Sequence, residues 1–180
     1  MAGDDYKLSS KRWFHGETTS RKAFDDQRWD RDRSMASPNE NGPGLYFTSS
    51  QSEARNYGPF VYEALTRSNF RLLHSKVKPT RRLLRDLWVS ANKEDRQIFL
   101  DNWNTTLPAE AFEQYAKQHT AFAAAVSLYG DLIRRPGEWV EAMRFAGFDG
   151  TVIDRALGVK HLVVWSPEKL VIRELPPGGV

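Results

Sequence analysis

The sequence contains no cysteine among its 180 residues. This absence excludes disulfide bonds, thiolate nucleophiles and cysteine-ligated zinc. Histidines are few and scattered, at His15, His74, His119 and His161, and no two of them have the spacing of a zinc-binding helix. We therefore expect no metal site in this protein.

Long apolar runs are missing as well. No stretch reaches the roughly 18 apolar residues of a transmembrane helix, and residues 1–13 lack the apolar centre of a signal peptide. These features predict a cytoplasmic protein without membrane contact. Because 40% of the 180 residues are hydrophobic, the chain is long enough for one core, and we expect residues 1–180 to form a single domain.

The charge of the chain is only mildly basic, with a formal net charge of +3. Its richest basic stretch runs from Lys76 to Arg85, at the entry to an expected helix. A solvated helix face is the simpler interpretation of this stretch. Contact with nucleic acid or with an acidic protein surface is the alternative.

A strand followed by a short helix is predicted shortly after the Pro/Gly-rich loop at 37–44. Residues 45–48 are β-prone, and Ser50-Gln51-Ser52-Glu53 is a capping box. In such a box Ser50 accepts from the backbone N–H of Glu53, while the Glu53 carboxylate bonds the N–H of Ser50. The helix should begin near residue 51 and stop at Gly58-Pro59.

The rest of the chain predicts strands on both sides of a helical block. Residues 60–66 and 70–73 have strand character, residues from about 80 to 146 have helical periodicity, and 150–153, 162–165 and 170–172 return to strand character. Asp149-Gly150 and Ser166-Pro167 are typical of turns. The expected fold class is therefore α+β, with a helical insertion at about 80–146. Its apolar stripes, expected in the core, comprise Leu83, Leu84, Leu87, Trp88, Ala111, Phe112, Tyr115, Phe122 and Val126.

One set of residues suits the binding of NAD, which needs an aromatic slot for the nicotinamide and polar groups for the ribose. Tyr46 and Tyr57 can line the slot, His15 can bond a ribose hydroxyl, and Gly16 admits a ligand close to the backbone. The matching segments are Phe14-His15-Gly16-Glu17, Gly44-Leu45-Tyr46-Phe47-Thr48, Ala54-Arg55-Asn56-Tyr57, 147–152 and 161–170.

In order and spacing these segments resemble the histidine-tyrosine-glutamate branch of the ADP-ribosyltransferases, which includes the poly(ADP-ribose) polymerases and diphtheria-toxin-type enzymes. The C-terminal segments are most similar to phage-borne members, including domains of phage polyvalent proteins. The resemblance implies split antiparallel β-sheets around an NAD cleft. It implies that His15 bonds the adenosine ribose, that the Gly16 backbone pairs with the nicotinamide amide, and that Tyr46 and Tyr57 sandwich the ring.

The sequence departs from the family at the third catalytic position. There the family has a glutamate that bonds the ribose 2′-hydroxyl and stabilises an oxocarbenium-like transition state, whereas this chain has His161. Loss of a carboxylate should weaken electrostatic stabilisation of that state. Asp154 is the first candidate to supply the missing acid, and Glu17 is the second.

The resemblance predicts a mono-ADP-ribosyltransferase that moves ADP-ribose from the co-substrate NAD to a macromolecular acceptor, a protein rather than a nucleic acid. His15, Tyr46, His161 and Asp154 are the expected catalytic residues, and His15, Gly16, Tyr46 and Tyr57 the expected NAD-binding residues. The alternative is a binding or inhibitory module that keeps the fold without catalysis. NAD hydrolysis and RNA 2′-phosphate transfer are further options.

Overall fold

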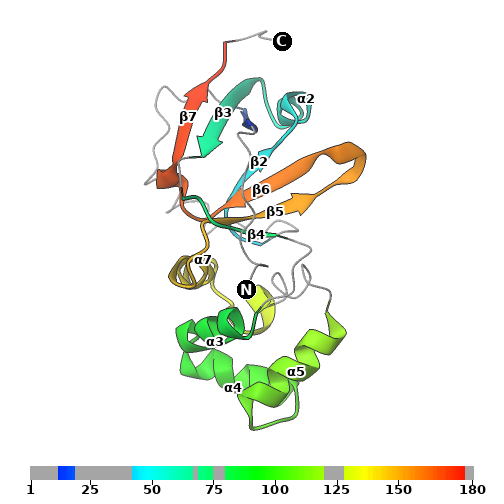
Figure 1. Ribbon diagram of the computed structural model, residues 1–180, viewed down its shortest axis with the longest axis vertical. Helices are drawn as coiled ribbons and strands as arrows, with labels where there is room; N and C mark the ends of the chain where they lie inside the picture. The colour runs from blue at the N-terminus through cyan, green and yellow to red at the C-terminus, as the bar shows by residue number, and fades with distance from the viewer. Residues whose placement is uncertain (1–11, 19–41, 67–68, 75–79, 120–127, 177–180) are drawn as a thin grey trace.

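The computed structural model describes residues 12–18, 42–66, 69–74, 80–119 and 128–176. It has a mixed α+β fold in which the strands lie at one end of an elongated molecule and most helices at the other (Figure 1). The expected fold class is thus confirmed at the level of α+β. The strands are β1 (Trp13–Glu17), β2 (Leu45–Thr48), β3 (Phe60–Thr66), β4 (Leu72–His74), β5 (Gly150–Asp154), β6 (Lys160–Val164) and β7 (Leu170–Glu174).

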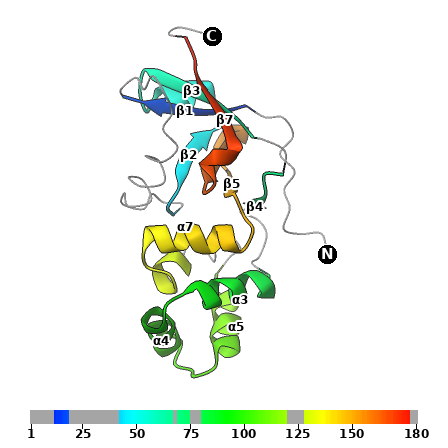
Figure 2. The same ribbon diagram turned by 90° about the vertical axis from the view of Figure 1, so that its left-hand side faces the viewer.

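The seven strands form one curled sheet in the order β4-β5-β6-β2-β1-β3-β7, with β4 and β5 parallel and the other neighbours antiparallel. Its weakest seam lies between β1 and β2, which share a single residue pair, Phe14 with Thr48. By contrast, β1 shares five pairs with β3, and β2 shares four with β6. In Figure 2, β1 and β3 therefore lie across the upper end while β2 descends away from them.

The helix after β2 begins where the capping box predicts. Helix α2 (Gln51–Arg55) has Ser50 as its N-cap, and the Ser50 hydroxyl accepts from the Glu53 N–H at 3.2 Å. The other half of the box is not formed. The N–H of Ser50 instead donates to the Thr48 hydroxyl at 3.1 Å, because Thr48 stands closer along the turn and leaves the Glu53 carboxylate to find other partners.

The helical block encloses a core that continues into the end of the sheet. Phe99 and Tyr115 are fully buried there, and they belong to one cluster with Leu73, Phe148 and Trp165 from the sheet end. Leu83, Leu84 and Leu87 are buried as predicted, whereas Trp88 and Phe112 are only partly buried, and Phe122 and Val126 lie outside the described residues. The helices are α3 (Arg81–Ser90), α4 (Lys93–Asn102), α5 (Pro108–Gln118) and α7 (Pro136–Phe145), with α7 lying between the sheet and α3 (Figure 2).

Asp149 plays a larger part than the turn residue that its pairing with Gly150 suggests. Its carboxylate accepts from the backbone N–H of Arg71 at 2.8 Å and from Lys169 Nζ at 2.7 Å, and its carbonyl accepts from the N–H of Trp165 at 2.7 Å. Asp149 therefore links the segments that immediately precede β4 and β7 to the start of β5. The turn between β5 and β6 lies further on, at residues 155–159.

Candidate functional site

The strand register decides which expected site residues share a face of the sheet. Thr48 lies opposite His161, and Tyr46 lies opposite Val163, so the side chains of Tyr46, Thr48 and His161 project from one face. Helix α2 covers this face, which we call the α2 face. Gly16 also points to it, because a Cβ placed on Gly16 would lie 1.8 Å from the carbonyl oxygen of Ala54 in α2. The glycine is thus required by the close approach of the helix.

A chain of polar contacts on the α2 face joins a carboxylate to His161. Nε2 of His161 lies 3.0 Å from Oε1 of Glu53, and the Thr48 hydroxyl donates to Oε2 of the same carboxylate. Nε of Arg155 donates to Nδ1 of His161 at 3.3 Å. Because Nδ1 accepts, the neutral imidazole carries its proton on Nε2 and donates it to Glu53. We refer to Thr48, Glu53, Arg155 and His161 as the Glu53 network.

The network keeps the Glu53 carboxylate ionised. Burial pushes the pKa of Glu53 upward, but hydrogen bonds from Thr48 and His161, together with electrostatic attraction by His161 and Arg155, outweigh that effect. The net result is a pKa below the usual range of a glutamate. The ionised carboxylate of Glu53 therefore lies at the start of β6, and the Glu53 side chain is 29% exposed.

A second histidine–carboxylate pair lies on the opposite face of the sheet. His15 Nδ1 is 2.5 Å from the carbonyl oxygen of Tyr46, and Nε2 is 2.8 Å from Oε1 of Glu17. The side chains of His15 and Glu17 are only 7% and 8% exposed. A carbonyl and a carboxylate both need a donor, so the geometry requires either an imidazolium with an ionised Glu17 or a neutral pair with the proton on Glu17. His15 also bridges β1 to β2 where their ladder ends.

The two expected nicotinamide-binding tyrosines reach the α2 face from different elements. Tyr46 comes from β2, and its hydroxyl donates to the carbonyl of Gly42. Tyr57 follows α2, with its Cβ 3.2 Å from the position a Gly16 Cβ would take and its side chain exposed, since the residue is 61% exposed. The structure therefore gathers Gly16, Tyr46, Tyr57 and His161 on one side of the sheet and places the His15 ring on the other.

Neither acid considered for the third catalytic position meets His161. Asp154 pairs with Lys160 in the β5–β6 register, one residue from the pair of Ile153 and His161, so its side chain projects from the opposite face. Its carboxylate lies 2.7 Å from Lys160 Nζ and 3.9 Å from His74 Nε2. Glu17 is likewise on the far face, against His15. The acid that contacts His161 is Glu53, which sequence reasoning had assigned to the capping box.

No family model and no curated protein matches the chain. Among solved structures, one described as "Crystal structure of an anti-CRISPR protein" is similar at a TM-score of 0.36 and 13% identity, over 92% of this chain and 96% of that one. At that TM-score the likeness does not establish a common fold. Within the described residues, no helix combines the length and apolar character of a membrane span, and no cluster of three metal-ligating side chains occurs.

Proposed function

We propose that this chain is an NAD-dependent mono-ADP-ribosyltransferase, which transfers ADP-ribose to a macromolecular acceptor and releases nicotinamide. The observation that carries the proposal is the gathering of Tyr46, Tyr57 and an ionised carboxylate on the α2 face, beside the seam where β1 and β2 part. Aromatic faces suit the flat nicotinamide ring, and a fixed negative charge suits the positive charge that develops on the ribose.

The seam itself supports the placement of the nicotinamide amide. Pairing of β1 with β2 ends at Phe14, two residues before Gly16, while Gly16 pairs with Val61 of β3 on its other side. The edge of Gly16 toward β2 therefore has no strand partner in the described ladder. A carboxamide has one donor and one acceptor group, which allows it to pair with such a backbone edge as another strand would.

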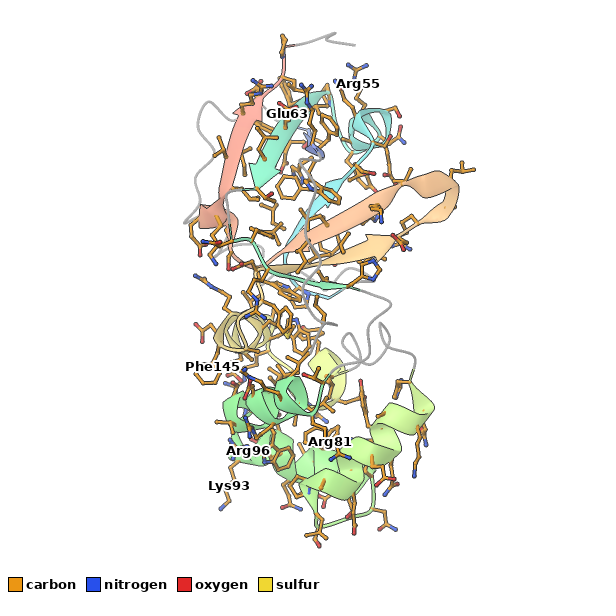
Figure 3. The ribbon with its side chains drawn as sticks, viewed as in Figure 1. Arg55, Glu63, Arg81, Lys93, Arg96 and Phe145 are labelled. Carbon is orange, nitrogen blue, oxygen red and sulfur yellow. The ribbon has the colours of Figure 1, made fainter. Side chains whose placement is uncertain are left out.

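The proposal is tested by incubating the protein with labelled NAD and a cell lysate, while following both transfer of the label and release of nicotinamide. Tyr57→Ala should weaken NAD binding about tenfold, the upper range for loss of an aromatic stack, and should lower labelling accordingly. Phe145→Ala is the matched control, because Phe145 is 70% exposed on the helical block (Figure 3). Absence of both label and free nicotinamide with the unaltered protein would refute the enzymatic function.

A second candidate function is favoured by one feature of the helical block. Arg82 and Arg85 of α3 have side chains 83% and 73% exposed and share the single carboxylate of Asp86. The first turn of α3 holds no acid, although a helix N-terminus favours negative charge. A polyanion-binding module is consistent with this arrangement.

The two candidates respond to different variants. If α3 binds nucleic acid, Arg82→Glu with Arg85→Glu should abolish a salt-sensitive anisotropy change with a labelled oligonucleotide, and Tyr57→Ala should leave that change intact. Oligonucleotide binding that does not depend on these arginines would count against the module.

A further inference from the structure

We infer that Glu53 is the acid that acts on the ribose of NAD, in place of the glutamate that His161 replaces. This inference rests on the proposed function, which it deepens by naming the residue on the bond-breaking side of the site. Helix α2 brings Glu53, which lies 108 residues before His161 in the sequence, to the start of β6.

The orientation of Glu53 is set by donors on both of its oxygens. His161 occupies Oε1 at 3.0 Å and Thr48 occupies Oε2, so the carboxylate plane is held from two strands. A carboxylate has about four acceptor positions, and these contacts use two of them. The remaining lone pairs can accept a ribose hydroxyl, and the partly exposed side chain makes them accessible to a ligand on the α2 face.

Asp154 and Glu17, the two acids that the sequence suggested, lack this arrangement. Glu17 is buried to 8% exposure against His15, and Asp154 is neutralised by Lys160 at 2.7 Å. A lysine ammonium next to Asp154 would cancel the negative charge that must face a cationic transition state. The Glu53 carboxylate is instead contacted by a hydroxyl and an imidazole, those of Thr48 and His161, and Arg155 donates to the His161 ring.

The reaction balances with NAD and the acceptor as the only reactants. The bond between ribose C1′ and the nicotinamide nitrogen breaks, and its electron pair leaves with neutral nicotinamide. The carbocation character at C1′ is stabilised by the Glu53 carboxylate. The acceptor nucleophile then supplies the electron pair of the new bond to C1′, and its proton passes to Glu53 and on to water.

His161 and Arg155 act through Glu53 and are positioning residues. Arg155 donates to Nδ1, so His161 carries its proton on Nε2 and points it at the carboxylate. Thr48 is buried at 4% exposure and holds the other oxygen. His161 therefore does not replace the acid in this inference; it orients the Glu53 carboxylate.

The test compares Glu53→Gln with Glu168→Gln in the full chain. Glu168 is a matched control, because it is a half-exposed acid 3.0 Å from Arg144, in the segment between β6 and β7. Glu53→Gln should release nicotinamide from NAD about 10² to 10³ times more slowly, the usual effect of removing one charge-stabilising group, while its Kd for NAD stays within about threefold. Glu168→Gln should match the unaltered protein in both.

His161→Gln separates positioning from catalysis. It should slow nicotinamide release less than Glu53→Gln does, and it should move the acidic limb of the pH–rate profile upward, because Glu53 loses a donor that favours its ionised form. A merely structural role would change the rate without moving that limb. Thermal unfolding of each variant, followed by circular dichroism, confirms that the compared proteins are folded.

The outcomes distinguish the two proposals. Release of nicotinamide by Glu53→Gln at more than a third of the normal rate would overturn the role of Glu53 and leave the transferase intact. A loss of NAD affinity as large as the loss of rate would also overturn it, by assigning Glu53 to substrate binding. Failure of the unaltered protein to bind or cleave NAD would overturn the proposed function itself, and this inference with it.

Discussion

The sheet carries two histidine–carboxylate pairs that are alike in contact and different in surroundings. His15 and Glu17 are 2.8 Å apart with side chains 7% and 8% exposed, whereas His161 and Glu53 are 3.0 Å apart with side chains 14% and 29% exposed. The first pair links β1 to β2 through the contact between His15 and the Tyr46 carbonyl, where the ladder of the two strands ends. The second leaves part of a carboxylate open to a ligand. The same chemical pair therefore serves structure where water is excluded and can serve chemistry where it is not.

The largest expected effect comes from breaking the buried pair. His15→Leu removes the imidazole from a buried carboxylate, so we expect the free energy of unfolding to fall by about 3–5 kcal/mol. His161→Leu removes a histidine at nearly the same distance from a more exposed carboxylate and should lower it by only about 1 kcal/mol. Urea denaturation of both variants measures the difference.

The double variant His15→Leu with Glu17→Leu sharpens this comparison. Because the buried carboxylate of Glu17 is then removed together with its partner, most of the stability lost in His15→Leu should return. Equal losses in His15→Leu and His161→Leu would show that burial does not distinguish the two pairs.

A smaller effect is expected at the glycine where α2 crosses β1. Gly16→Ala would place a Cβ 1.8 Å from the Ala54 carbonyl oxygen, so α2 must shift, and we expect a loss of about 1–3 kcal/mol. Gly137→Ala is the control, because its Cβ would meet no atom within 4 Å in helix α7. That change should be neutral or stabilise by up to about 1 kcal/mol. Thermal unfolding of the two variants side by side provides the measurement, and a neutral Gly16→Ala would argue against the tight approach of α2.

The smallest effect concerns the pH dependence of the exposed pair. The pKa of Glu53 is lowered in the folded protein, so its contribution to stability is present above its pKa in the unfolded chain and is lost as pH falls through its folded pKa. The difference in unfolding free energy between the unaltered protein and Glu53→Gln should therefore shrink on going from pH 7 to pH 3. It should be below about 1 kcal/mol throughout, because the pair is partly exposed. A difference that grows toward low pH would contradict the assignment.

Local sequence was a good guide to the elements of this fold. Strands were expected at 45–48 and 60–66 and occur there, and α2 begins at residue 51 under the Ser50 cap. These features depend on alternation, turn chemistry and capping over a few residues, all of which can be seen in the sequence. The placement of Tyr46, Gly16 and Tyr57 on one face follows from the same strands and helix once their register is known.

Local sequence did not determine which side chains the carboxylates of Glu53 and Asp154 would contact. Glu53 was expected to bond the backbone of Ser50, yet a threonine two residues earlier took that N–H and freed the carboxylate for His161. Asp154, at the end of the preceding strand β5, projects from the other face because of strand alternation. Amino-acid pattern thus determined the strands, the capped helix and the residue types of the site. Only the tertiary fold decided which acid faces His161, because that contact spans 108 residues and depends on strand register and helix docking.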